Sequence, residues 1–140
     1  MKRRAVIVER AAHRRLRLID ALRKDFQIDS IEMLDGCLRL VRTIRPDLVL
    51  IGVGRRTQLS ARMAYQIKTD GAQPPLVGLL DWDGRLSDPA AVVVDSMVDG
   101  ILLGSPTSER LEAFLSALAD DEPSIIGELP TRGWRKLLGR

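Results

Sequence analysis

Aromatic residues, cysteine and histidine are scarce in this sequence of 140 residues. Aromatics are only 4% of it, too few to interleave with basic side chains as they do on nucleic-acid-binding surfaces. The lone cysteine, Cys37, cannot form an internal disulfide, and the lone histidine, His13, excludes a multi-histidine metal site and argues against a His-dependent catalytic triad. We therefore expect no metal ion, no cofactor, no enzymatic activity and no nucleic-acid partner.

Long apolar runs are also missing. The apolar run after the basic start, residues 5–8, is too short for a signal peptide. No other run approaches the roughly 20 apolar residues of a membrane-spanning helix. The sequence thus predicts a cytoplasmic protein.

Charge is unevenly distributed. Residues 1–24 hold nine basic and two acidic residues, whereas residues 25–131 hold nine basic and seventeen acidic ones. The last nine residues add four basic groups and no acid. The net charge of +3 therefore comes from the two ends of the chain and does not by itself indicate a nucleic-acid binder.

Short apolar segments alternate with amphipathic ones along the chain. The β-branched and apolar runs predict strands at residues 4–8, 27–34, 47–53, 75–80 and Gly100–Leu103. Helices are predicted at residues 11–25, Cys37–Ile44, 59–68 and 108–119, with another beginning near Asp88-Pro89, an N-cap followed by proline. This alternation predicts a doubly wound α/β domain with a five-stranded parallel sheet in the order 2-1-3-4-5.

The first predicted helix has two faces. Its apolar face is predicted to hold Ala12, Leu16, Ile19, Leu22 and Phe26. A basic stripe lies opposite and is either a solvated surface or a docking surface for an acidic partner; it comprises Arg10, His13, Arg14, Arg17 and Lys24.

Several segments resemble the receiver domain of bacterial response regulators. They are Val-Ile-Val-Glu at 6–9, Met-Leu-Asp-Gly at 33–36, Arg-Pro-Asp-Leu-Val-Leu-Ile at 45–51, Pro-Leu-Val at 75–77, and Asp-Gly-Ile-Leu-Leu at 99–103 before Pro106. The resemblance covers about residues 3–120 and implies a flavodoxin-like (βα)5 fold. It also implies a pocket with two acids for Mg²⁺, a phosphate-accepting aspartate, a hydroxyl residue and a lysine.

Most of these groups are replaced at the matching positions. Glu9 supplies one acid, but Arg10 takes the second position, where its guanidinium would fill the place of the cation. Gly52 stands at the acceptor position and has no carboxylate to phosphorylate. The remaining changes are Leu80 for the hydroxyl residue and Gly104 or Ser105 for the lysine. Asp81 and Asp83 are predicted to be solvated turn residues.

Two further surfaces are candidates for binding. Arg10, Arg55 and Arg56 follow predicted strands, and they form either a site for a phosphate-bearing small ligand or a solvated rim. The resemblance implies self-association or docking through the fourth helix, fifth strand and fifth helix. The residues there include Asp95, Asp99, Ile101 and Arg110.

The chain end is predicted to lie outside the domain. We place the domain at residues 1–121 and a basic tail at residues 122–140. Trp134 and neighbouring leucines alternate with basic residues in this tail, which would dock on a partner, touch an acidic membrane, pack back on the domain or remain disordered.

These patterns predict a pseudo-receiver, a receiver-like domain without phosphorylation chemistry. We expect an adaptor or scaffold that binds proteins in bacterial signalling or localisation, with a homodimer as one arrangement. The alternative hypothesis is a small-ligand sensor that uses the arginines of the altered pocket.

Overall fold

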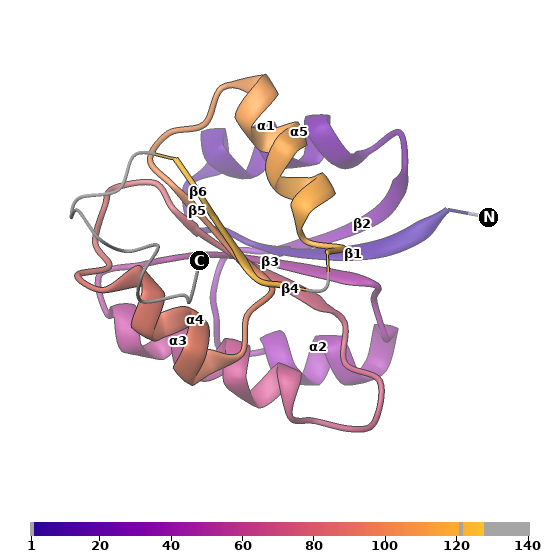
Figure 1. Ribbon diagram of the computed structural model, residues 1–140. Helices are drawn as coiled ribbons and strands as arrows, with labels where there is room; N and C mark the ends of the chain where they lie inside the picture. Colours follow the sequence, from indigo (N-terminus) through magenta and orange to yellow (C-terminus); the bar gives the residue numbers. More distant parts are fainter. Residues whose placement is uncertain (1, 121, 128–140) are drawn as a thin grey trace.

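The computed structural model describes residues 2–120 and 122–127. Its strands form a parallel sheet in the order β2-β1-β3-β4-β5-β6 (Figure 1). The strands are β1 (Arg3–Val8), β2 (Phe26–Ile31), β3 (Leu48–Gly52), β4 (Leu76–Asp81), β5 (Gly100–Leu103) and β6 (Ser124–Ile126). The helices are α1 (Ala12–Leu22), α2 (Cys37–Ile44), α3 (Thr57–Lys68), α4 (Pro89–Ser96) and α5 (Ser108–Ala117). The predicted doubly wound fold and the order of its first five strands are confirmed.

Helices cover both faces of the sheet. Figure 1 shows α1 and α5 on one face and α2, α3 and α4 on the other. Side chains alternate along each strand, so Ala5 and Ile7 of β1 pack in the α1–α5 layer while Val6 and Val8 pack in the opposite layer. This two-sided burial explains why the strands read as continuous apolar runs in the sequence.

Two helices begin at residues whose side chains cap them, and one of these, Asp88, was predicted. The side chain of Asp88 accepts a hydrogen bond from the Ala91 N–H of α4 at 3.1 Å, and Pro89 occupies the first turn. Thr107 caps α5 by accepting from the Arg110 N–H at 3.2 Å. These side chains satisfy backbone donors that the first helical turn leaves free.

The predicted inward face of α1 is confirmed at Leu22 and wrong at Ala12 and Leu16. Leu16 is 64% exposed and Ala12 is exposed as well, whereas Leu18 and Leu22 are buried. Because successive residues of a helix are separated by about 100°, the helix is turned by roughly one residue from the predicted orientation. Arg14 and Arg17, which flank the buried face, consequently lie close to the sheet.

The sheet continues past the predicted domain end at residue 121. β6 pairs with β5 in parallel, in the register Gly100↔Ser124 to Leu102↔Ile126. Ile125 is buried in the α2–α4 layer, and Ile126 packs partly buried in the other layer. A strand of three residues is too short to show a period in the sequence, which is why it was missed.

Within the described ranges, no helix is long and apolar enough to cross a membrane.

Candidate functional site

Glu9 fills the space beside Gly52 at the carboxyl edge of the sheet. Glu9 directly follows β1, Gly52 ends the neighbouring strand β3, and the Glu9 side chain is turned over this glycine. A Cβ atom added at position 52 would lie 2.3 Å from Glu9 Oε1 and 2.9 Å from its Cδ. The space that an acceptor side chain would enter is therefore occupied by a carboxylate from the adjacent strand.

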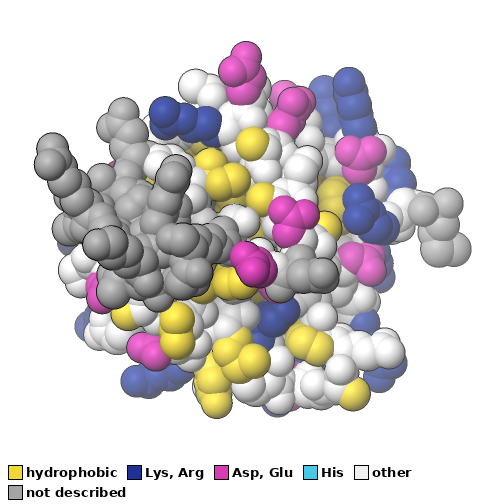
Figure 2. Space-filling model, viewed as in Figure 1, with side chains coloured by type: hydrophobic (Ala, Val, Ile, Leu, Met, Phe, Trp, Pro, Cys, Tyr) yellow, Lys and Arg dark blue, Asp and Glu magenta, His cyan; other side chains and the backbone are white. Residues whose placement is uncertain are grey.

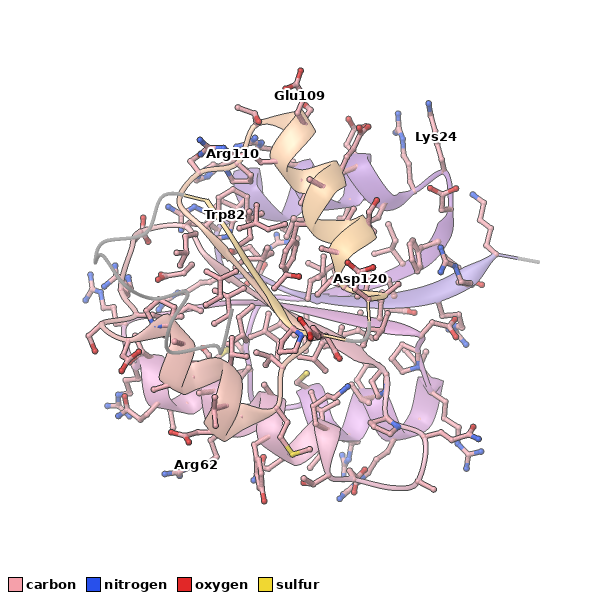
Figure 3. The ribbon with its side chains drawn as sticks, in the orientation of Figure 1. Lys24, Arg62, Trp82, Glu109, Arg110 and Asp120 are labelled. Atoms are coloured by element: carbon pink, nitrogen blue, oxygen red, sulfur yellow. The ribbon has the colours of Figure 1, made fainter. Side chains whose placement is uncertain are left out.

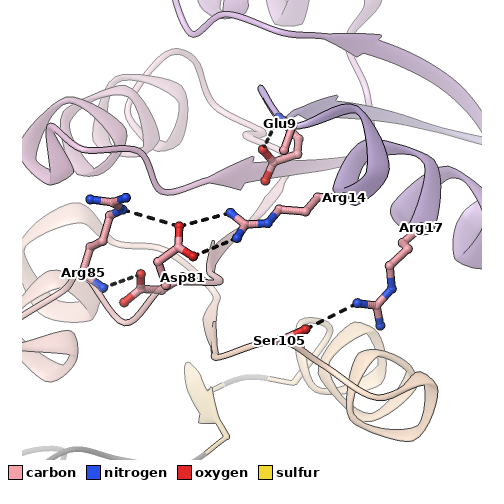
Figure 4. Close-up of polar contacts among 8 residues, drawn as sticks. Glu9, Arg14, Arg17, Asp81, Arg85 and Ser105 are labelled. Carbon is pink, nitrogen blue, oxygen red and sulfur yellow. Dashed lines mark hydrogen bonds and ion pairs between the residues drawn. The ribbon is translucent and has the colours of Figure 1, made fainter.

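The Glu9 carboxylate is held in a buried position. Glu9 is only 6% exposed, and its Oε2 accepts a hydrogen bond from the Ala11 N–H at 2.9 Å (Figure 4). Arg15 donates to the backbone carbonyl of Glu9 at 2.9 Å, which fixes the chain just before α1. Among the described residues, Oε1 has no hydrogen-bond partner. Nor do these residues contain a group of three or more His, Cys, Asp or Glu side chains able to hold a metal ion.

The other altered positions of the pocket lack polar side chains aimed at Gly52. Leu80 pairs with Gly52 across β4 and β3, is 1% exposed and packs in the α1–α5 layer. Gly104 has a positive φ of 81° and donates its N–H to the Asp81 carbonyl at 2.9 Å. Ser105 is exposed, and its hydroxyl lies 3.5 Å from Arg17.

Asp81 is a buried structural residue, which corrects the expectation of a solvated one. It is 0% exposed, and its two carboxylate oxygens accept from the backbone N–H groups of Arg85 and Leu86 at 2.8 and 2.9 Å. Both oxygens are thus used to close the turn after β4. Because Asp81 is buried and both of its oxygens accept these hydrogen bonds, it does not present a free carboxylate to phosphate or metal.

An ion pair covers the pocket on the α1 side. Arg14 donates to the two carboxylate oxygens of Asp83 at 2.7 and 3.2 Å, and Arg85 approaches Asp83 at 3.5 Å (Figure 4). The hydrogen bond from Arg14 is the main cause that lowers the pKa of Asp83, and the same bond raises the pKa of Arg14. The charge of Glu9 adds a smaller upward effect on the pKa of Arg14. Asp83 is therefore a partner of α1 rather than a free turn residue.

Two arginines of α1, Arg14 and Arg17, stack on Trp82. The guanidinium carbons of Arg14 and Arg17 lie 5.3 and 5.6 Å from the centre of its ring, within the range of cation–π contacts. Trp82 is only 6% exposed and points into the α1–α5 layer (Figure 3), and its Nε1 has no partner in the described part of the chain. Arg17 also donates to the carbonyl of Pro106. Sequence reasoning did not single out Trp82, although its place directly after the β4 pattern was a signal.

The predicted contact of the Arg10 guanidinium with the Glu9 carboxylate does not form, and Glu9 Oε1 has no partner among the described residues. Arg10 is exposed and makes no ion pair with a described residue, whereas Arg14, one helical turn further on, faces the pocket. The three arginines of the predicted anion site, Arg10, Arg55 and Arg56, are all exposed and without ion-pair partners among the described residues. They follow the neighbouring strands β1 and β3 and so lie at the same edge of the sheet.

The predicted basic stripe is divided by these contacts. Arg14 and Arg17 are bound to the β4–α4 and β5–α5 loops, whereas His13 and Lys24 remain exposed. Lys24 lies past the end of α1 and points away from the molecule (Figure 3). The four basic residues Arg10, Arg14, Arg17 and Lys24 therefore do not form one continuous free surface.

The surface expected around α4, β5 and α5 is only partly available. Ile101 is 0% exposed in the core, and Asp99 is held by Lys68 at 2.8 Å and by the Val77 N–H at 2.8 Å. These two residues were predicted at a docking surface, but β5 is covered by helices on both faces, so Ile101 is buried in the core. Asp95 and Arg110 are exposed, and Trp134 lies outside the described residues.

The fold has close counterparts among solved structures. The chemotaxis response regulator CheY4 of Vibrio cholerae matches with a TM-score of 0.71 and 11% identity, over 84% of this chain and 99% of that one. A response regulator from Thermotoga maritima matches with a TM-score of 0.68 and 16% identity, over 86% and 100%. The N-terminal domain of the nisin resistance regulator NsrR matches with a TM-score of 0.70 and 14% identity, over 84% and 98%.

No protein-family model and no curated protein sequence matches the chain. At such low identities the structural likeness shows the fold alone. The chain has the fold of response-regulator receiver domains, to which it adds the short strand β6.

Proposed function

We propose that this chain is a receiver-like signalling module that binds other proteins without being phosphorylated and without catalysing a reaction. The receiver fold supports a role in signal transduction. The bacterial source of the structural counterparts named above is in keeping with an adaptor or scaffold in a bacterial pathway.

The observation that carries the proposal is the position of the Glu9 carboxylate. Phosphorylation of a receiver-like pocket requires a carboxylate nucleophile with open space above it for the phosphoryl group. Here the acceptor position is a glycine, and the space above it holds a buried carboxylate with an unpaired oxygen. That negative charge would also repel an incoming phosphoryl donor.

Labelling by a small phosphodonor tests the proposal. The full chain, incubated with acetyl phosphate and Mg²⁺, is expected to gain no adduct of about 80 Da, the mass of one phosphoryl group, in its intact mass. A receiver domain that is known to be phosphorylated serves as the positive control. Recovery of a bound partner protein is expected to be equal with and without the phosphodonor. An adduct that is lost in Asp83→Asn or Asp81→Asn would contradict the proposal and identify the acceptor.

A second candidate function is supported by the free arginines at the same edge. Arg10, Arg55 and Arg56 have no ion-pair partner in the described part of the chain, and guanidinium groups suit phosphate recognition. A small-ligand sensor predicts that ATP, GTP or a cyclic dinucleotide raises the melting temperature by mass action. A saturable rise that disappears in Arg55→Ala would place this function ahead of the protein-binding one.

A further inference from the structure

An apolar groove lies between the carboxyl end of β2 and α2. Its volume is about 520 Å³, and it is lined by Ile31, Glu32, Met33, Gly36, Arg39, Leu40 and Thr43. Met33 is 67% exposed, while Ile31 and Leu40 are partly buried against the core. The three side chains together give the groove an apolar floor with one exposed edge at Met33.

The charges around the groove are unevenly neutralised. Glu32, the acid of the lining, is paired with Arg15 at 3.5 Å. Arg39 also lines the groove, is exposed and has no ion-pair partner among the described residues.

A second free cation lies at the same edge. The Glu9 N–H donates to the Ile31 carbonyl at 3.0 Å, which brings the next residue, the unpaired Arg10, to the end of β2. Asp35, exposed in the loop before Gly36, is the opposing charge. Two free cations against one free acid give this surface a positive excess.

We propose that the groove docks a segment of a partner protein that inserts an apolar side chain beside Met33 and Leu40 and places an acidic residue beside Arg39. The inference rests on the proposed function, because it assigns a surface and a partner chemistry to the interaction module. Apolar anchors in a groove with charges at the rim are the common form of such sites. An apolar lining does not suit nucleic acid, whose binding neutralises several phosphates.

The basic end of the same chain does not have the acidic chemistry that the proposal assigns to the occupant. Residues 128–140 contain four basic residues and the single acid Glu128, so their net charge has the same sign as that of Arg39 and the two repel each other. A different apolar surface lies over α3 and α4, where Figure 2 shows apolar side chains gathered and where Tyr65, Val94 and Met97 are 46%, 65% and 52% exposed. Nothing in the structure indicates what covers that surface, but it provides matched control residues.

Selection from a random 12-residue peptide library, with the full chain immobilised, tests the proposal. The enriched peptides are expected to carry Leu, Ile, Met or Phe within one helical turn of Asp or Glu. A labelled enriched peptide should bind Met33→Ser and Arg39→Glu at least about tenfold more weakly in fluorescence anisotropy. Val94→Ser and Arg62→Glu make the same changes on α4 and α3 and should leave the affinity unchanged. All four residues are exposed, so the melting temperature should be retained in each variant.

The other outcomes would contradict the groove, its proposed occupant or the protein-binding function. Basic peptides, or peptides whose binding is lost in Val94→Ser but kept in Met33→Ser, would refute the groove while leaving the interaction module intact. A dimer of the chain that Met33→Ser dissociates in sedimentation would assign the groove to a second copy instead. Absence of any enriched peptide would contradict both the groove and the protein-binding function.

Discussion

At the scale of single residues, Glu9 and Gly52 depend on each other. The glycine is required by close approach, since the Glu9 carboxylate lies where any Cβ atom at position 52 would be. The carboxylate is in turn held by the N–H of Ala11, the residue directly before α1. The glycine at position 52 thus makes room for the buried carboxylate of Glu9.

The first prediction concerns this pair. Gly52→Ala should lower the free energy of unfolding by about 1 kcal/mol, the lower end of the cost of overpacking, because the carboxylate ends a flexible side chain and can swing toward solvent. Denaturant titration of the purified variant measures the change.

The companion variant is Glu9→Ala, which removes the clashing atoms. In that background Gly52→Ala should be nearly neutral, so that the double-mutant cycle yields a coupling of about 1 kcal/mol between the two sites. Additive effects would show that the two side chains do not contact each other.

The second prediction concerns Arg14 and Asp83. Because the pKa of Asp83 is lowered in the folded protein, its contribution to stability is present above its ordinary value and is lost as the pH falls through the lowered one. Asp83→Asn should therefore destabilise the protein at pH 7 and have a smaller effect near pH 3, where part of this contribution is lost. The Asp83 side chain is 39% exposed, so the effect at pH 7 should be only about 0.2–1 kcal/mol.

Asp95→Asn provides the matched control for that experiment. Asp95 is exposed on α4 and has no ion-pair partner among the described residues, so the same loss of charge there should not change stability with pH in this way. An Asp83→Asn variant whose stability loss is equal at pH 7 and pH 3 would show that the ion pair contributes through packing rather than charge.

At the scale of secondary-structure elements, the orientation of α1 decides which arginines are free. Two apolar stripes are possible on this helix, one through Leu16 and one through Leu18, and the sequence period does not distinguish them. In the structure, Leu18 packs in the core, and the arginines beside it reach Trp82 and the loops after β4 and β5. Contacts made by distant loops therefore set the rotation of the helix.

The third prediction tests that rotation. Leu18→Ala should lower the free energy of unfolding by about 2–5 kcal/mol, as expected for a buried leucine, because it leaves a cavity in the α1–α5 layer. Leu16→Ala, at 64% exposure, should change stability by no more than about 0.5 kcal/mol. The opposite ranking in thermal or denaturant unfolding would restore the face predicted from the sequence.

Elements with strong local signals were predictable, and those defined by distant contacts were not. Cys37–Ile44 and Gly100–Leu103 match the predicted bounds, and α4 begins at the predicted cap, because apolar period, proline and capping residues act locally. The absence of an acceptor at Gly52 was also readable from the strand pattern. The buried placement of the Glu9 carboxylate was not, since it depends on two strands brought together by the sheet. The stacking of Arg14 and Arg17 on Trp82 could not be predicted either, because it joins segments that are distant in the sequence.

At the scale of the whole molecule, the two edges of the sheet differ. β2 has six residues, pairs with β1, and leaves its outer side and the neighbouring groove open. At the other edge β6 pairs with β5, and Ile125 of β6 is buried in the core. A strand edge that is free can pair with another chain, so a covering strand limits such pairing.

The fourth prediction compares a chain that ends at residue 127 with one that ends at residue 121, the predicted domain boundary. Removal of β6 takes Ile125 from a position that is 7% exposed and leaves the outer backbone groups of β5 without their partners. Burial of an isoleucine side chain contributes about 1.5–3 kcal/mol, so the shorter chain should unfold at a clearly lower denaturant concentration. It should also self-associate more strongly in sedimentation, because an open edge of β5 can pair with a second molecule.

Ile125→Ala in the full chain should reproduce the loss of stability but not the self-association, since it keeps the backbone of β6 in place. Equal unfolding midpoints for the two truncated chains would contradict a structural role for β6 and restore the domain end at residue 121.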